Sequence, residues 1–578
     1  MSTDYPRTDF QRKELRWESL NGPWSFLFDD DDVGLQQCWY GHGLPNTAGD
    51  NAKRDIEVPF VFQCTASGID ERGVHEVLWY ERIIEDICPA YDTDSCLILR
   101  FGAVDYHAKI WVDGRFVGEH RGGHVPFDLD ITDAISRDHG GRSRLTVRVF
   151  DSAFDLTQPR GKQYWGPKPE DIFYTPSSGI WQSVWLESVP RLRIADSSHG
   201  TVIRSNNIEE GTIDARIAVL GRRTREPCYI ELEVSLAGIP ISKSGRQDIL
   251  EHENFTRFNH SMRLPPDILF DLSPAIRSNM HNNVALWSPE QPTLYDLTIH
   301  LYSTTTNALL DSITTTTGMR SLKWNAGDST FRLNNQPYFH ALLLDQGYWP
   351  TSLLTPPTST ACKTDILLSK AMGFNGCRKH QKVEDPLFLY WADRLGFLVW
   401  GEMAAAYTFS LDYVDRFDEE WTAMVRRDIN HPCVVAWTPV NESWGYPDLG
   451  GNVQQRDHIR SLYYRTKTLD PTRPINDNCG WEHVVTDLST FHDYADAEGM
   501  GERCESVGAI LGRGRGMFLG EVNGPKGEYD GGSRHVKGAP VLCTEFGDVN
   551  IGSNDEGRKE SWVGLFAVMT GFVLEQNS

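Results

Sequence analysis

Three features that often assign a sequence quickly are absent from this one. Its eleven cysteines, spread from Cys38 to Cys543, contain no CxxC pair, which argues against a zinc site or a dense disulfide framework and favours a reducing compartment. Residues 1–17 are polar and lack an apolar h-region, and nowhere do about 18 apolar residues follow one another. The sequence therefore predicts neither an export signal nor a membrane span, and we expect a cytoplasmic protein that does not bind membranes.

Positive charge is also scarce. The chain has 56 Lys and Arg against 80 Asp and Glu, a formal net charge of -24 at pH 7. Proteins that bind nucleic acids cluster Lys and Arg against the phosphates, so we expect no nucleic-acid partner. The 18 Trp and 20 Tyr weakly favour a neutral carbohydrate partner, because flat rings stack on sugars, although most of them should pack in cores. No metal constellation or cofactor motif is found, and the sequence does not indicate an oligomeric state.

The 578 residues are enough for about three domains. Up to about residue 190 the chain consists of short β-rich runs broken by Gly, Asp and Pro, with a hairpin turn at Asp113-Gly114. Residues 191–320 repeat this style, so we expect two β-sandwiches, over residues 1–190 and 191–320. The stretch 512–538, rich in Gly and charge, is expected to be a long loop.

From residue 321 to 578 short apolar runs alternate with helical segments, which is the pattern of βα units around a parallel sheet. Helices are expected at 361–372, 385–395 and 558–576. Strands are expected at 338–344, 373–378, 397–403, 434–442, 474–478, 487–494 and 540–546.

The ends of these strands carry most of the polar side chains that point to chemistry. In α/β barrels the carboxyl ends of the strands meet at one face, where active sites lie. The candidates for this face are Asp345, Arg378, His380, Glu402, Asn441, Glu442, His492, Tyr494 and Glu545, with Trp481 as a sugar platform.

Two of these residues fit the hydrolysis of a glycoside, which needs one protonated and one ionised carboxyl group across the scissile bond. Glu442 is the expected acid/base, because the amide of Asn441 beside it can hold a sugar hydroxyl. Glu545 is then the nucleophile. Arg378 would keep Glu545 ionised and Tyr494 would hydrogen-bond it, while His380 and His492 suit sugar hydroxyls.

Each residue also has a simpler interpretation. An Asn-Glu dipeptide occurs by chance, Glu402 can cap or pair within the structure, and single histidines are more often structural than catalytic. Trp481 can pack at the rim. Glu521 in "GMFLGEVNG" is a rival nucleophile, although its apolar run is short.

These residues carry a resemblance to glycoside hydrolase family 2, the group of β-galactosidases, β-glucuronidases and β-mannosidases. The stretch "RRDINHPCVVAWTPVNES" is similar to its acid/base signature, "PVLCTEFG" resembles its nucleophile strand, and "GFNGCRKH" resembles its second strand. Upstream, "LNGPWSF", "VLWYER", "TPSSGIWQSVWLE" and "LWSPEQPTLYDLTI" resemble its jelly-roll and immunoglobulin-like domains. The resemblance implies a jelly roll, an immunoglobulin-like sandwich and a (β/α)8 TIM barrel, with Glu442 as acid/base and Glu545 as nucleophile. It also implies a retaining exo-glycosidase of β-galactosidase type.

Two departures from that family leave alternatives open. The first strand ends in "ALLLDQGYWP" rather than the sequence typical of β-galactosidases, so the sugar can be a galactoside, glucuronide, mannoside or furanoside. Only 578 − 545 = 33 residues follow Glu545, so the barrel is expected to lack its eighth strand and to leave strand edges unpaired. A second hypothesis is therefore a truncated, impaired carbohydrate-binding product. A third, an aldolase-like barrel, would need a Schiff-base lysine, for which only Lys379 lies near a strand end.

Overall fold

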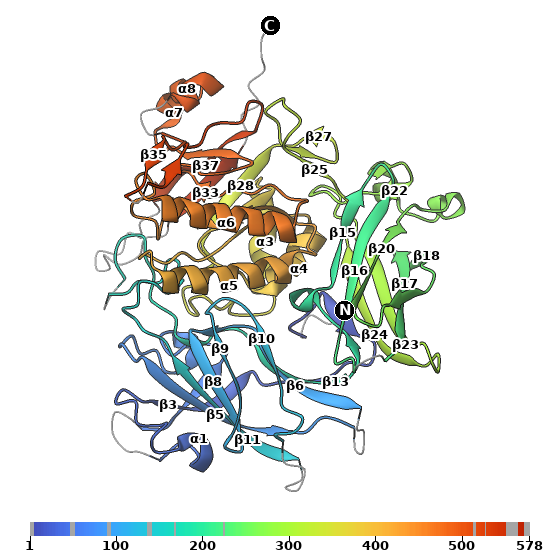
Figure 1. The fold of residues 1–578 in the computed structure, drawn as a ribbon, viewed down its shortest axis with the longest axis vertical. Coiled ribbons are helices and arrows are strands. Elements are labelled where there is room, and N and C mark those ends of the chain that lie inside the picture. The colour runs from blue at the N-terminus through green and yellow to red at the C-terminus, as the bar shows by residue number, and fades with distance from the viewer. Residues whose placement is uncertain are drawn as a thin grey trace.

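The computed structural model describes residues 5–46, 52–89, 94–135, 141–166, 169–223, 226–512, 516–525, 527–550 and 564–570. Figure 1 shows a blue β-sandwich, a green β-sandwich and a yellow-to-red barrel flanked by helices. Hydrogen bonds join the barrel to both sandwiches, for example Arg160 N to Ala405 O (3.0 Å) and Ser197 Oγ to Arg427 O (2.8 Å). Within the described residues, no helix combines the length and apolar character needed to cross a membrane.

Two antiparallel sheets form the first sandwich around an apolar core. The turn predicted at Asp113-Gly114 is confirmed, since both residues have positive φ and the strands on either side pair with each other. In spatial order the larger sheet is β4 (Arg54–Val58), β3 (Gly22–Phe28), β5 (Val77–Glu85), β11 (Arg142–Phe150), β8 (His107–Val112) and β9 (Arg115–Arg121). The smaller sheet is β10 (Phe127–Asp130), β6 (Ser95–Phe101), β13 (Val184–Pro190) and β2 (Arg16–Ser19), and β7 (Val104–Asp105) pairs with β12 (Gly179–Ile180).

The second sandwich also has two main sheets, packed around a core of its own. One contains β1 (Phe10–Arg12), β24 (Leu309–Thr317), β23 (Tyr295–Ser303), β17 (Cys228–Leu236), β18 (Ile239–Lys243) and β19 (Gln247–Ile249). The other contains β14 (Arg193–Ile194), β16 (Thr212–Leu220), β15 (Val202–Asn207) and β20 (Phe255–Ser261). β1 differs from the expected assignment of residues 1–190 to the first sandwich, because it pairs with β24 of the second.

The barrel strands lie where the apolar runs predicted them. Four neighbouring strands are parallel: β28 (His340–Asp345), β29 (Gly376–Lys379), β30 (Leu398–Glu402) and β31 (Val434–Thr438). All residues of β29, β30 and β31 are buried, as expected of parallel strands covered on both faces. Then follow β32 (Val440–Asn441), β33 (Asn478–Cys479), β34 (Ser489–His492) and β37 (Val541–Asn550).

The last described strand corrects the prediction for the end of the chain. β38 (Gly564–Thr570) lies in the segment expected to be a helix, and it pairs antiparallel with both β37 and β28. The unpaired edges expected on strands one and seven are therefore joined by β38. Among the described residues no parallel strand follows β37. A short apolar run does not distinguish strand from helix by itself, and two partner edges decide in favour of the strand.

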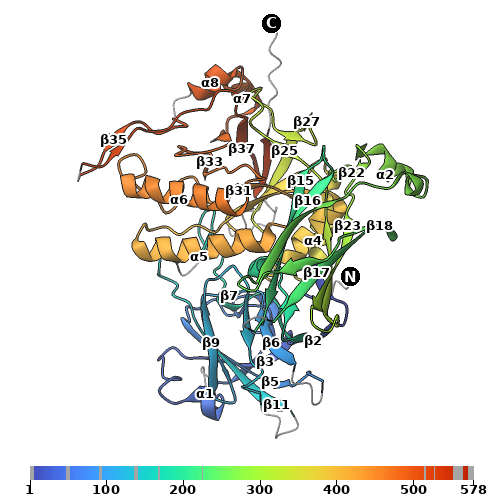
Figure 2. The same ribbon diagram turned by 45° about the vertical axis from the view of Figure 1, so that its right-hand side comes forward.

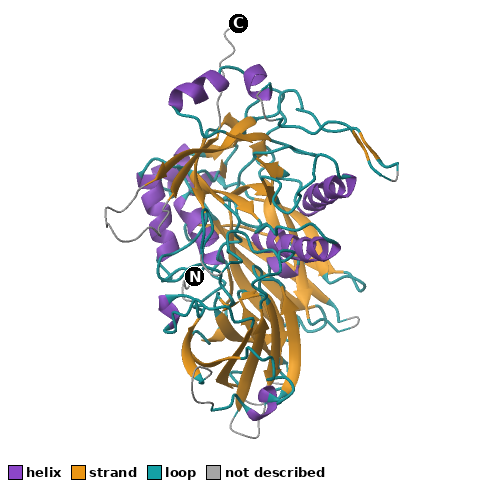
Figure 3. Ribbon diagram, turned by 90° about the vertical axis from the view of Figure 1, so that its left-hand side faces the viewer, coloured by secondary structure: helices purple, strands orange, loops and turns teal. Residues whose placement is uncertain are grey.

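Helices cover the outside of the barrel, as Figure 3 shows in purple. They are α3 (Ala361–Ala371), α4 (Pro386–Leu395), α5 (Leu411–Asp428), α6 (Val453–Leu469), α7 (Ala497–Arg503) and α8 (Val507–Leu511). α4 shows why these segments are helical: Asp385 caps its first turn by accepting from Leu387 N at 2.8 Å, Pro386 is its first residue, and Gly396 ends it with φ of 68°.

Short elements complete the chain. In the sandwiches these are α1 (Trp39–His42), α2 (Pro274–Ser278), β21 (Met280–His281) and β22 (Val284–Ala285). Before the barrel come β25 (Leu322–Lys323), β26 (Arg332–Leu333) and β27 (Gln336–Pro337). The stretch expected to be a loop before the seventh barrel strand carries the hairpin of β35 (Val522–Asn523) and β36 (Tyr529–Asp530).

Candidate active site

The end of the fourth barrel strand places Asn441 and Glu442 at the barrel mouth. Glu442 and Ser443 have φ values of 49° and 58°, in the left-handed region. This backbone costs a residue other than glycine about 1 to 2 kcal/mol and is found at functional sites, where surrounding contacts enforce it. Here Glu442 N donates to Cys479 O at 3.1 Å, and Ser443 N donates to Asn478 Oδ1 at 2.8 Å. The fifth strand therefore fixes the direction of the Glu442 side chain.

Glu545 lies in β37 and is only 5% exposed. One of its oxygens accepts a hydrogen bond from Arg378 Nη2 and the other accepts from the hydroxyl of Tyr494. Burial alone would raise the pKa of this carboxyl group, but the positive charges of His492 and Arg378 outweigh it and hold the pKa well below its usual range. Glu545 is therefore held ionised, which is the state a carboxylate nucleophile needs.

His492 lies between the two glutamates. Its Nδ1 is 2.7 Å from Glu442 Oε1 and its Nε2 is 3.5 Å from Glu545 Oε1. Burial lowers the pKa of an imidazole, but the charge of Glu545 and the hydrogen bonds to Cys479 and Glu442 raise it. One oxygen of each glutamate and one nitrogen of His492 all lie within 4.8 Å of one another. The two carboxylates are thus close neighbours on either side of a cationic ring.

Arg378 is held by three partners at once. It is fully buried and donates to Glu545, to Glu402 Oε2 at 2.8 Å and to Asn441 Oδ1 at 3.1 Å. The other oxygen of Glu402 accepts from Gln381 N at 2.9 Å, and burial raises the pKa of Glu402 to about 7 despite Arg378. Glu402 is also fully buried, and its hydrogen bond orients Arg378. Its expected role in substrate binding stays a prediction.

His380 and Asn441 approach this cluster from the ends of the second and fourth barrel strands. His380 Nδ1 lies 3.2 Å from Glu402 Oε1 and 3.9 Å from Glu545 Oε1, and burial together with Arg378 lowers the pKa of His380 well below its usual value. The oxygen of the Asn441 amide accepts from Arg378, which fixes the amide orientation. Its N–H groups are therefore left to donate to a ligand.

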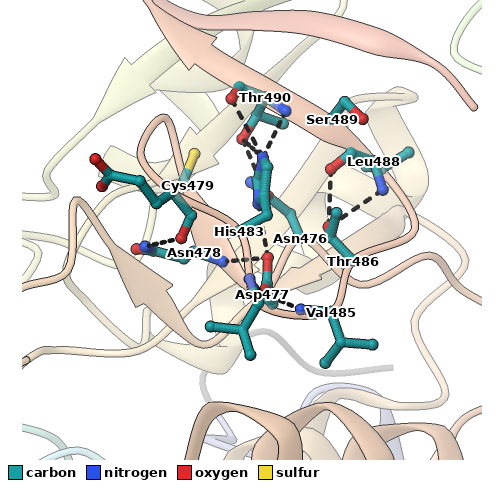
Figure 4. A network of polar contacts seen from close by, with 12 residues as sticks. Asn476, Asp477, Asn478, Cys479, His483, Val485, Thr486, Leu488, Ser489 and Thr490 are labelled. Carbon is teal, nitrogen blue, oxygen red and sulfur yellow. Dashed lines mark hydrogen bonds and ion pairs between the residues drawn. The ribbon is translucent and has the colours of Figure 1, made fainter. Parts of the chain in front are cut away.

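A network of polar contacts connects the residues around β33 to β34 (Figure 4). His483 donates from Nδ1 to Asp477 Oδ1 at 2.7 Å, and its Nε2 accepts from Thr490 N at 2.8 Å. The hydroxyl oxygen of Thr490 accepts from Gly480 N at 3.0 Å. Gly480 has φ of +80°, and a Cβ there would lie 2.1 Å from Nε2 of His492. Any residue other than glycine at position 480 would displace the His492 ring.

Two of the expected binding residues lie outside this cluster of contacts. Asp345 accepts from Lys379 Nζ at 2.5 Å and from Gly347 N at 2.8 Å. Lys379 also donates to Glu384 at 2.8 Å and is 3% exposed, so this lysine is held in a buried ion-pair network, which disfavours the Schiff-base alternative. Trp481 follows Gly480 in the loop after β33 and is half-buried; its role as a sugar platform stays a prediction.

The rival nucleophile Glu521 is exposed and directly precedes β35. Figure 2 shows that β35 belongs to a hairpin that projects away from the barrel. The carboxylate of Glu521 lies beside Tyr529 and raises the pKa of that hydroxyl. This position favours Glu545 over Glu521 as the nucleophile.

Sequence reasoning missed Lys162, which lies on the segment between β11 and β12 of the first sandwich. It is 4% exposed and its Nζ lies 4.5 Å from the centre of the Trp444 ring. Burial lowers the pKa of Lys162 to about 8, although the charges of the three glutamates of the site raise it. The segment has no strand or helix periodicity, so no pattern signalled this residue; only its place between Gly161 and aromatic residues is distinctive.

Among the residues that the structure describes, three groups of side chains bring ligand atoms close enough to hold a cation. The groups are Glu442, His492 and Glu545; Asp393, His431 and Cys433; and Asp128, Asp196 and His199. In the first of these groups, Arg378 and a protonated His492 already balance the charge of the carboxylates, which disfavours a further cation there.

Comparison with family models matches three parts of the chain. Residues 17–190 match the model "Glycosyl hydrolases family 2, sugar binding domain", and residues 200–320 match "Glycosyl hydrolases family 2". Residues 358–507 match "Glycosyl hydrolases family 2, TIM barrel domain". All three models belong to the same family, and together they account for most of the chain.

Curated relatives and solved structures agree with these matches. The chain is similar to the β-glucuronidase of Felis catus (26% identity over 545 residues, covering 86% of this chain and 75% of the relative). It is also similar to a β-galactosidase of Leuconostoc mesenteroides (24% over 502 residues, 82% of this chain and 43% of the relative). Among structures, the β-glucuronidase of Bifidobacterium dentium complexed with coumarin-3-O-glucuronide has a TM-score of 0.72 at 18% identity, covering 94% of this chain and 85% of that one. At this identity the structure supports the shared fold alone.

Proposed function

This chain belongs to glycosyl hydrolase family 2 and is a glycoside hydrolase, and from that premise we propose that it is a retaining exo-glycosidase acting on terminal β-glycosides. Glu545 is the nucleophile and Glu442 is the acid/base. The two residues carry out two successive displacements at the anomeric carbon, so the product keeps the β configuration.

In the first step a carboxylate oxygen of Glu545 attacks the anomeric carbon while the protonated Glu442 gives its proton to the glycosidic oxygen, which leaves with the aglycone. A covalent glycosyl-enzyme results. In the second step Glu442, now ionised, takes a proton from water, and the water oxygen displaces Glu545 from the sugar. Arg378 and Tyr494 hold Glu545 in line for both displacements, since they bind its two oxygens.

The observation that carries this proposal is the spacing of the two carboxylates. At least one oxygen of Glu442 lies within 4.8 Å of one of Glu545. Retaining glycosidases hold their carboxyl groups about 5 to 5.5 Å apart, whereas inverting enzymes leave roughly 6.5 to 9.5 Å for a water molecule. The short spacing supports the covalent route.

The identity of the terminal sugar is less narrowly defined than the type of glycosidic bond that is cleaved. The sequence favoured a β-galactosidase-like activity, but the relatives named above include a β-glucuronidase as well as a β-galactosidase. The substrate class is therefore a terminal β-glycoside of which glucuronides and galactosides are the first candidates. A catalytically impaired carbohydrate-binding protein is not favoured, because Glu442, Glu545 and their hydrogen-bond partners lie together at the barrel mouth.

The test is hydrolysis of a panel of 4-nitrophenyl β-glycosides, followed by nuclear magnetic resonance of the first-formed sugar. We expect release of the β anomer before mutarotation. Release of the α anomer would exclude the covalent mechanism and the assigned role of Glu545.

A further inference from the structure

Lys162 reaches the barrel mouth from the first sandwich. The amides of Arg160 and Gly161 both donate to the carbonyl oxygen of Ala405, at 3.0 and 2.9 Å. Gly161 has φ of +59°, and a Cβ there would lie 2.2 Å from the carbonyl oxygen of Gln381. The backbone that carries Lys162 therefore lies in direct contact with two barrel loops, so the position of the lysine is fixed relative to the catalytic strands.

The ammonium group of Lys162 is desolvated, and the described residues offer it no anionic partner. The residue is 4% exposed, and Nζ lies over the ring of Trp444 at 4.5 Å and over that of Phe173 at 5.8 Å. In the described part of the chain, no carboxylate oxygen forms an ion pair with this group within 4.0 Å and no acceptor receives a hydrogen bond from it. Glu545 and Glu442 act on it only from a longer range.

The other cations at the strand ends are all paired. Arg378 donates to Glu545 and Glu402, His492 lies 2.7 Å from Glu442, and Lys379 donates to Asp345 and Glu384. An ammonium group that is nine-tenths buried and unpaired is costly unless a bound ligand supplies the missing acceptor. Lys162 therefore differs from its neighbours in having its hydrogen-bond donors left for a ligand.

We propose that Lys162 binds the carboxylate of a uronic acid in the sugar subsite, so that the enzyme selects β-glycosides of uronic acids over those of neutral sugars. The proposal rests on the function proposed above, because the sugar must lie between Glu545 and Lys162. A carboxylate is favoured over a hydroxyl as the ligand, since only an anion supplies the charge that the buried ammonium lacks.

The first experiment compares kcat/KM for 4-nitrophenyl β-glucuronide and β-galacturonide with kcat/KM for the matching glucoside and galactoside. The variants are Lys162→Met and Lys162→Arg, and Lys243→Met on the second sandwich is the control, since Lys243 is exposed and distant in the fold. We expect Lys162→Met to lower kcat/KM for the uronides by about 10- to 100-fold, mainly through KM, and to change neutral glycosides by less than about threefold. Lys162→Arg should restore part of the loss.

The second experiment measures binding without turnover. D-glucuronate and D-glucose are titrated into the wild-type protein and Lys162→Met at a pH below the lysine pKa of about 8. We expect the wild type to bind glucuronate more tightly than glucose and the variant to lose this preference.

The outcomes separate the two proposals. Equal losses on uronides and neutral glycosides, or a wild type that cleaves neutral glycosides but neither cleaves uronides nor binds glucuronate, would overturn the role of Lys162 and leave the retaining mechanism standing. Glucuronate binding that depends on Lys162, in a protein that hydrolyses no glycoside, would support the lysine contact and overturn the proposed function.

Discussion

Nδ1 of His492 lies 2.7 Å from Oε1 of Glu442, and the opposite nitrogen of the same ring lies 3.5 Å from Glu545. In the proposed mechanism one negative charge moves between these two glutamates, because Glu545 loses its charge to the sugar as Glu442 loses its proton. A cationic imidazole between them is close to that charge in both states. His492 is therefore placed to stabilise the free enzyme and the glycosyl-enzyme by similar amounts.

The division of labour between the glutamates can be tested by removing each carboxylate. Glu545→Ala should lower kcat by about 10⁴-fold or more, because no covalent intermediate can form, and azide should restore turnover with an inverted product. Glu442→Ala should still form the glycosyl-enzyme from substrates with good leaving groups, which need little acid assistance. Burst kinetics and mass spectrometry would detect this intermediate as it accumulates.

Glu521→Ala is the matched control for these variants, since Glu521 is exposed beside the projecting hairpin of β35 and β36. Its kcat should stay within about twofold of the wild type. If Glu521→Ala lost activity while Glu545→Ala kept it, Glu545 would not be the nucleophile.

Replacing His492 by Gln should change the pH dependence as well as the rate. The cationic ring helps to hold the pKa of Glu545 low, so its removal should raise that pKa. The acid limb of the kcat/KM profile, below which Glu545 becomes protonated, should then move to higher pH, and kcat/KM at neutral pH should fall about 10- to 100-fold. A profile that falls uniformly without moving its acid limb would show that His492 only positions Glu442.

The strand ends of the barrel could be predicted because parallel strands are read from short, continuous apolar runs. The run before Asn441 and Glu442 is fully buried in β31, and the run around Glu545 forms β37. Since all such strands end at one face, the sequence was sufficient to bring Arg378 and the two glutamates together. Asp345 also ends a barrel strand, where it pairs with Lys379, and its role in substrate binding stays a prediction.

Contacts between distant parts of the chain determine the structural features that local sequence patterns could not predict. Lys162 lies 442 − 162 = 280 residues before Glu442, and hydrogen bonds of the neighbouring residues to Ala405 bring it to the barrel. No periodicity of the sequence encodes such a contact. The segment of β38 was predicted as a helix because its apolar run fits both structures, and its pairing with β28 and β37 was not visible in the sequence.

Gly480→Ala tests whether the site depends on the close approach of this backbone to His492. The added Cβ would lie 2.1 Å from Nε2 of His492, and alanine is strained at φ of +80°. The ring must then move away from one or both glutamates, so kcat/KM should fall about 100-fold. Gly450→Ala is the control, because nothing lies within 4 Å of its added Cβ. Equal activity of the two variants would mean that the position of His492 does not limit catalysis.

The buried carboxylate of Glu384, which follows the second barrel strand, should make the stability of the fold depend on pH. Its carboxylate accepts from Lys379 Nζ at 2.8 Å and lies 2.9 Å from Lys382 Nζ. Burial would raise its pKa, but the two lysines lower it to about 2. Because the folded-state pKa lies below the unfolded value of about 4.3, the pair stabilises the fold fully above that value. The stabilisation is lost as the pH falls from about 4.3 towards 2.

Glu384→Gln should therefore lower the free energy of unfolding by about 3 kcal/mol at neutral pH, where it leaves two buried ammonium groups without their shared carboxylate. The difference in Tm between the wild type and the variant should shrink as the pH falls below about 4.3, because the wild-type carboxylate then becomes protonated as well. Differential scanning calorimetry from neutral pH to about pH 3 measures this difference. Glu251→Gln, at an exposed position, should change stability by less than about 0.5 kcal/mol at every pH. A difference that stays constant across the range would show that the charge of Glu384 does not stabilise the barrel.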